Sequence, residues 1–138
     1  MIGVFLIIIC LIGIFSLIFI SRMSAKTIYR KRINHQAIDS EWQKIQEASN
    51  SKDIVKVRSA VLSADKLVDY LLKAKGYQGK TIAERVKKAR NEFGDLYDKF
   101  WGAHKSRNRI VHELGNEVRY YEAQQSLKIF MQVIQRIK

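Results

Sequence analysis

The chain of 138 residues contains 25 lysines and arginines against 13 acidic residues, with a formal net charge of +12, no proline and one cysteine. One cysteine excludes an intramolecular disulfide framework and a cysteine-based zinc site, and the length allows one domain and hardly two. The charge favours an anionic partner, nucleic acid or an acidic membrane surface, although a basic surface that only keeps a small domain soluble has the same balance.

The first twenty residues, MIGVFLIIICLIGIFSLIFI, carry no charged side chain. As a helix with a rise of about 1.5 Å per residue they would extend roughly 30 Å, the thickness of the hydrocarbon core of a bilayer. A cleaved signal peptide would instead have a basic start, a shorter apolar run and small residues at a cleavage site. We therefore predict a retained transmembrane anchor over residues 1–21, with the lipid bilayer as a partner.

Residues 22–36 form a basic juxtamembrane segment, because no acidic residue occurs between the apolar run and Asp39. Basic flanks stay on the cytoplasmic side of a membrane and are attracted to anionic headgroups. The sequence thus predicts a single-pass membrane protein with its N-terminus outside and its C-terminal domain in the cytoplasm. The cations expected at the membrane surface are Arg22, Lys26, Arg30, Lys31 and Arg32.

Residues 37–138 are predicted to form an all-α domain. Proline is absent, and there is no Asn-Gly or Asp-Gly hairpin turn. Apolar residues recur at helical spacing, and short connections make consecutive helices antiparallel neighbours. The expected fold is a single N-terminal transmembrane helix followed by a four- or five-helix up-and-down bundle. The predicted helices cover residues 40–48, 52–75, 81 to a break at Gly94 or Gly102, 103–114, and 118 or 121 to the C-terminus.

Two local patterns refine this prediction. Thr81 followed three residues later by Glu84 is a capping box, which marks the start of a helix. An aromatic stripe at helical spacing then follows, which could stack on nucleic-acid bases but more often belongs to a hydrophobic core. We favour the core for these residues, which are Phe93, Tyr97, Phe100 and Trp101.

The segment KSRNRIVHEL, residues 105–114, is the candidate functional motif. On an ideal helix Lys105, Asn108 and His112 share one face. Arg107 and His112 are five residues apart, which places them about 140° apart around the axis. The two side chains can therefore enter one cleft only if the start of the helix is distorted or a second copy of the chain completes the site. An antiparallel pair of these helices across a two-fold axis would do so.

These residue types suit cleavage of RNA without a metal or another cofactor. The imidazole of His112 can act as general base or acid, and the guanidinium of Arg107 can fork onto a phosphate and stabilise a phosphorane. Asn108 can orient the imidazole or the phosphate. RNA carries its own nucleophile, the 2′-hydroxyl, so the products would be a 2′,3′-cyclic phosphate and a 5′-hydroxyl.

The run Arg107-Asn108-Arg109-Ile110-Val111-His112 resembles the hallmark of the HEPN superfamily (higher eukaryotes and prokaryotes nucleotide-binding domains). That hallmark is arginine, a polar residue, three to five variable residues and histidine. The resemblance implies a helical bundle, a homodimer through the motif helix, and RNA or a nucleotide as ligand. It implies Arg107 and His112 as the catalytic pair of a metal-independent endoribonuclease, with Asn108 as an accessory residue. Other members of the superfamily are non-catalytic.

The alternative is that the motif only supports the fold. Asp65 lies on or beside the apolar stripe of the long helix 52–75, where a carboxylate needs a cation or hydrogen-bond donors. Arg107, Lys105 or His112 could provide them, whereas His104 is left outside the candidate site. Paired in this way, the motif would belong to a non-catalytic, membrane-tethered helical module for dimerisation or partner recruitment.

Overall fold

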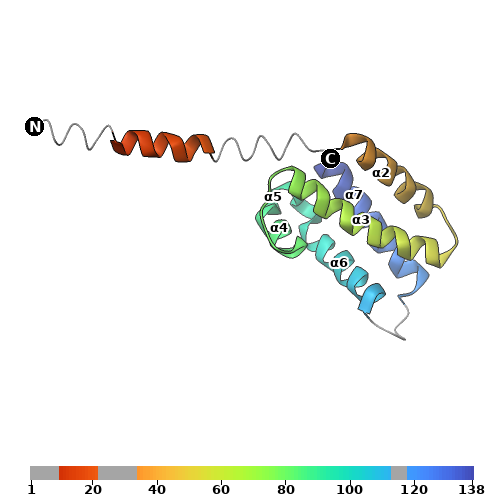
Figure 1. Cartoon of the computed structure of the whole chain (residues 1–138). Coiled ribbons are helices and arrows are strands. Elements are labelled where there is room, and N and C mark those ends of the chain that lie inside the picture. The colour runs from red at the N-terminus through yellow and green to blue at the C-terminus, as the bar shows by residue number, and fades with distance from the viewer. Residues whose placement is uncertain (1–9, 22–33, 113–117) are drawn as a thin grey trace, which may run out of the picture. The chain divides into compact units, whose positions relative to one another are not determined.

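The computed structural model describes residues 10–21, 34–112 and 118–138 (Figure 1). The chain divides into two compact units, residues 1–33 and 34–138, which are considered separately. In the first unit residues 10–21 are helical and their large apolar side chains are exposed. Among the described residues, no helix is both long enough and apolar enough to cross a bilayer. Residues 1–9 of the predicted span, and the five predicted membrane-surface cations from Arg22 to Arg32, lie outside the described residues.

The second unit confirms the all-α prediction, since its described residues form helices and no strand. Four of the helices are long and the others are short pieces in the connection between the second and third long helices. In chain order the elements are α2 (His35–Ser49), α3 (Ile54–Ala74), α4 (Ile82–Lys88), α5 (Arg90–Phe93), the 3₁₀ helix η1 (Gly94–Leu96), α6 (Tyr97–His112) and α7 (Tyr120–Ile137).

The four long helices form an antiparallel bundle in which each runs opposite to the one before it (Figure 1). α3 and α7 are the central pair, and each of them also contacts α2 and α6. Contacts at both ends fix α7 against α2. Lys138 pairs with Asp39 at one end, and the Gln124 amide donates to the Ser49 carbonyl at the other.

The predicted aromatic stripe belongs mainly to the core. Phe93 and Phe100 are fully buried, with ring centroids 5.1 Å apart. The ring of Phe100 also packs edge-on against Phe130 of α7 at 5.6 Å, which is a favourable geometry for aromatic pairs. Tyr97 and Trp101 are half-buried beside this cluster. α6 is thereby packed against α7 through its N-terminal half.

Helix boundaries differ from prediction where a cap or a glycine decides them. α2 begins at His35 rather than Ser40, because the Asn34 side chain accepts a hydrogen bond from the Ala37 amide at 3.0 Å. The cap predicted at Thr81 is present, since its hydroxyl accepts from the Glu84 amide at 3.2 Å. Gly94 adopts φ of 54° and ends α5, whereas Gly102 lies inside α6. Consequently α6 starts six residues earlier than predicted.

The short helix α5 is held against the end of α3 by Glu92. Lys75 Nζ lies 2.8 Å from one carboxylate oxygen of Glu92, and the Tyr77 hydroxyl donates to the other at 3.0 Å. The hydrogen bond from Lys75, assisted by that from Tyr77, lowers the pKa of Glu92 below its ordinary value, against the smaller opposing effect of burial.

We expect the substitution Glu92→Gln to lower stability at neutral pH by less than about 1 kcal/mol, because this pair is partly exposed. A carboxylate whose pKa is lowered by folding stabilises the fold above its unfolded pKa, and loses that contribution as pH falls through the folded value. Urea unfolding at pH 7 and near pH 3 should therefore show a difference from wild type that disappears in acid. Glu47→Gln, at an exposed α2 position without an ion pair among the described residues, is the control. A difference that persists in acid would contradict the assignment.

Candidate functional site

The predicted motif lies in the C-terminal half of α6, where the helix is continuous from Tyr97 to His112. Lys105 and His112 are exposed, while Arg107 and Asn108 are half-buried. Since no distortion interrupts the helix, the separation of about 140° between Arg107 and His112 holds within one chain. The structure therefore does not bring this pair into a common cleft of a single copy.

A buried cluster of charged and polar side chains connects α6 to α3. Asp65 of α3 is 4% exposed. His104 Nδ1 lies 2.7 Å from Asp65 Oδ1, and Arg107 Nε lies 3.2 Å from Asp65 Oδ2. A carboxylate only accepts, so the proton of the first contact is on His104. The prediction that Asp65 needs a cation is confirmed for Arg107, whereas exposed Lys105 and His112 do not pair with it.

His104 is the site residue that the sequence reasoning missed. Its ring stacks on Phe100 at 5.7 Å with an interplanar angle of 13°, and Trp101 packs edge-on at 6.1 Å. The signal was present in the sequence, because His104 and Arg107 are three residues apart and share a helix face. A carboxylate on a facing helix therefore meets both side chains at once.

The guanidinium of Arg107 is held in a defined orientation. Its Nη1 donates to Asn108 Oδ1 at 3.0 Å. Its Nε is buried and close to Asp65, but this contact lacks the alignment of a hydrogen bond, so Nε has no hydrogen-bond partner. Asp65 thus neutralises Arg107 mainly as an ion pair. Asn108 orients Arg107 rather than His112, and the side chain of Arg107 remains 23% exposed.

Arg107 lines an open hollow of about 500 Å³, here named the α3–α4 hollow. Its wall is formed by α3, the residues before and in α4, and Arg107 of α6, and it does not include Lys105, Asn108 or His112. The lining residues are Asp65, Lys66, Asp69, Tyr70, Lys73, Lys80, Thr81, Ile82, Arg85 and Arg107.

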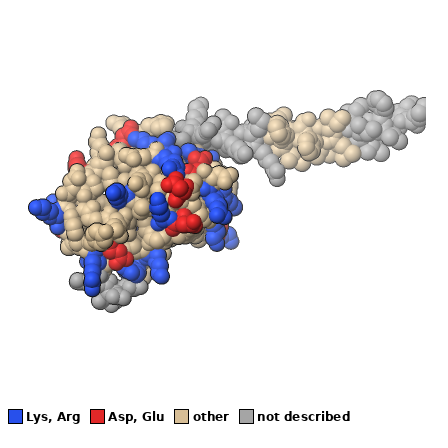
Figure 2. All heavy atoms as spheres, turned by 180° about the vertical axis from the view of Figure 1, so that it is seen from behind, with Lys and Arg blue, Asp and Glu red and all other residues tan. Residues whose placement is uncertain are grey.

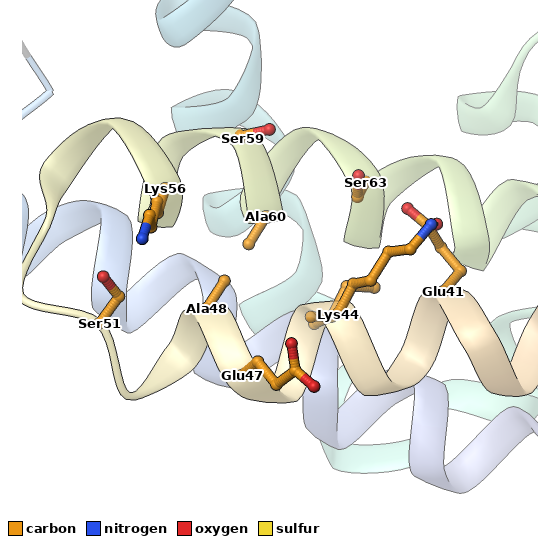
Figure 3. Close-up of a pocket in the computed structure, with 10 residues that line it drawn as sticks. Glu41, Lys44, Glu47, Ala48, Ser51, Lys56, Ser59, Ala60 and Ser63 are labelled. Atoms are coloured by element: carbon orange, nitrogen blue, oxygen red, sulfur yellow. The ribbon is translucent and has the colours of Figure 1, made fainter.

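A second hollow of about 420 Å³ lies between α2 and α3 (Figure 3). Small residues line part of it, with Ala48 and Ser51 on one side and Ser59 and Ala60 on the other, and the rest includes the charged side chains of Glu41, Lys44, Glu47 and Lys56. Within it Lys44 reaches Glu41 at 3.5 Å. No motif residue lines this second hollow.

On one face of the second unit the basic side chains do not form a continuous patch (Figure 2). The face in Figure 2 shows lysines and arginines separated by uncharged surface and by acidic groups. Arg109 of the motif pairs with Glu122 of α7, which removes one cation from the free surface of α6. In the part of the chain that the structure describes, no three histidine, cysteine, aspartate or glutamate side chains gather as metal ligands.

Comparison with protein-family models, curated proteins and solved structures finds no match for this chain. The resemblance to the HEPN superfamily therefore rests on the motif residues of α6 and remains a prediction.

We expect the substitution Asp65→Asn to lower the free energy of unfolding by about 2–3 kcal/mol, because it leaves the charge of Arg107 half-buried without its counter-ion. Asp98→Asn, at an exposed position on α6, is the matched control and should change stability by about 0.5 kcal/mol or less. Urea denaturation followed by circular dichroism measures both. An Asp65→Asn variant as stable as the Asp98→Asn variant would show that the ion pair does not hold α6 to α3.

Proposed function

We propose that this chain is a membrane-anchored, cytoplasmic HEPN-like domain that binds RNA and cleaves it without a metal ion. The observation that supports this best is the orientation and exposure of the two motif residues on α6. Arg107 is oriented by Asp65 and Asn108 with its side chain 23% exposed, and His112 is exposed near the end of the same helix. A fixed anion-binding group and an accessible acid-base group are the two parts that RNA cleavage by its own 2′-hydroxyl requires.

A two-fold pairing of α6 helices completes the proposed site, because one copy cannot direct both residues into one cleft. In such a dimer Arg107 of one copy lies opposite His112 of the second copy. One His112 removes the proton of the 2′-hydroxyl, and the 2′-oxygen forms a bond to phosphorus. The bond to the 5′-oxygen breaks, and the leaving oxygen takes a proton from the same His112, which the first step has converted to an imidazolium, so each site uses one His112. Arg107 stabilises the charge on the non-bridging oxygens.

Membrane attachment is proposed from the first unit. Residues 10–21 are helical and expose large apolar side chains, including Phe15 at 74% and Leu17 at 69%. Apolar surface of this kind is stable in a lipid environment and costly in water. With the uncharged residues 1–9 before it and a basic segment after it, this helix is proposed to anchor the domain with the N-terminus outside.

The buried cluster supports a second candidate function, a non-catalytic membrane-tethered module for dimerisation or partner recruitment. Asp65, His104 and Arg107 join α3 to α6 whether or not a ligand binds. In this case the arginine of the motif is retained for stability, and exposed His112 has no catalytic role. The two functions differ in what the exposed histidine does, and this difference can be measured.

The test uses the full chain in a non-ionic detergent, with labelled single-stranded RNA in EDTA. We expect wild type to produce 2′,3′-cyclic phosphate ends. His112→Ala should reduce the rate at least about 100-fold, because a general acid-base group contributes 10²–10⁴-fold. His35→Ala, which removes an exposed histidine at the start of α2, is the matched control and should keep full activity. Arg107→Lys, which retains a cation for Asp65, should lose most of the activity while keeping the fold.

The mixed dimer separates a shared site from two independent sites. A dimer of one Arg107→Lys chain and one His112→Ala chain, isolated with two affinity tags, retains one intact site and should show about half the wild-type activity. An inactive mixed dimer would place each site within one copy. No cleavage by wild type, or undiminished cleavage by His112→Ala, would overturn the ribonuclease proposal and favour the non-catalytic module.

A further inference from the structure

The α3–α4 hollow has a composition that neither the motif nor the core explains. Five of its lining residues are cationic and two are acidic, an excess of three positive charges in about 500 Å³. Clustered charges of one sign repel each other, so such a surface is costly unless an anion occupies it. The cations come from three separate parts of the chain, α3, the residues around α4, and α6. They meet only in the folded domain.

Both carboxylates of the hollow are already engaged by cations. Asp69 lies 2.6 Å from Arg85 Nε and 2.6 Å from Lys73 Nζ, and its side chain is 20% exposed. Asp65 is engaged by His104 and Arg107. The carboxylates therefore orient the basic groups and compensate part of their charge. Lys66 and Lys80 have no ion pair among the described residues, so their ammonium groups stay available to a ligand.

The two arginines of the hollow are fixed rather than mobile. Arg85 is 95% buried, since its exposed fraction is 5%, and it is held by Asp69 and by the carbonyl of Gly79. Arg107 is held by Asp65 and Asn108, and its buried Nε lacks a hydrogen-bond acceptor. Fixed guanidinium groups beside two free lysines form a preorganised set of donors, which reduces the entropy lost when an oxyanion binds.

We propose that the α3–α4 hollow binds a small phosphomonoester, with Lys66, Lys80 and Arg107 around its phosphate. A phosphomonoester carries close to two negative charges at neutral pH, whereas a phosphodiester carries one. The excess of three positive charges therefore favours the monoester. Tyr70 and Ile82 provide an apolar part of the wall for the organic portion of the ligand. The volume lies within the range of small-molecule sites, which is about 300–1,000 Å³.

This site goes beyond the proposed ribonuclease function. His112 and Asn108 do not line the hollow, and Lys66 and Lys80 have no part in the proposed cleavage. Arg107 alone is common to the two proposals. Lys66 and Lys80 are therefore the residues whose substitution tests the hollow without altering the proposed cleavage site.

The experiment titrates the full chain in non-ionic detergent with adenosine 5′-monophosphate, by calorimetry and by the shift of thermal unfolding. Cyclic adenosine 3′,5′-monophosphate and adenosine are the probes without a dianionic phosphate. We expect saturable binding of the monoester, at least about tenfold weaker binding of the cyclic diester, and none of adenosine. The double variant Lys66→Glu, Lys80→Glu should weaken binding of the monoester by about tenfold or more.

Lys87→Glu is the control, because Lys87 is an exposed lysine of α4 that does not line the hollow. It should bind the monoester like wild type, and circular dichroism should show that all variants fold. The proposal is overturned if the monoester does not bind, if the cyclic diester binds equally well, or if Lys87→Glu weakens binding as much as the double variant. Loss of RNA cleavage in the double variant without monoester binding in wild type would also overturn it, and would assign the hollow to RNA.

Discussion

The placement of α6 depends on one buried carboxylate. Asp65 sits in the apolar interface of α3 with 4% of its surface exposed, where an unpaired charge would cost several kcal/mol. His104 and Arg107 approach its two oxygens from α6, one on each. Because the partners are three residues apart on one helix, they fix both the rotation of α6 about its axis and its position along α3. A hydrophobic contact in the same place would leave that rotation less well defined.

The rotation of α6 then decides which motif residues can act together. With Arg107 turned toward Asp65, the side chain reaches the α3–α4 hollow, and His112 is exposed about 140° away around the helix. The opposite side of α6 is fixed to α7 by the pair of Arg109 and Glu122 and by the hydrogen bond from Ser106 to Glu122 at 3.2 Å. With both sides held, a small rotation of α6 cannot bring Arg107 and His112 into one cleft. Association of two copies is the remaining route to a joint site.

Sequence reasoning recovered the features that depend on short spacing. The helical spacing of apolar residues predicted α3, and the cap at Thr81 predicted the start of α4. The aromatic spacing predicted that Phe93 and Phe100 belong to the core. It also identified Asp65 as a carboxylate in need of a cation. It did not identify His104 as a partner, although His104 and Arg107 share a face of α6, because which face of α6 meets α3 depends on how the two helices pack. The α3–α4 hollow was not predicted for the same reason, since its basic residues belong to segments that meet only after folding.

The pairing of Arg107 with Asp65 also limits what Arg107 can contribute to binding. An ion pair at 3.2 Å has little net charge when viewed from a phosphate several ångströms away, so Arg107 offers directed N–H groups more than long-range attraction. The attraction has to come from lysines without an ion pair among the described residues, such as Lys66 and Lys80 in the hollow and Lys105 on the exposed face of α6. Attraction and orientation are thus carried by different residues in both proposed sites. The same Asp65 that secures the fold therefore makes Arg107 a selective donor, and leaves affinity to the lysines around it.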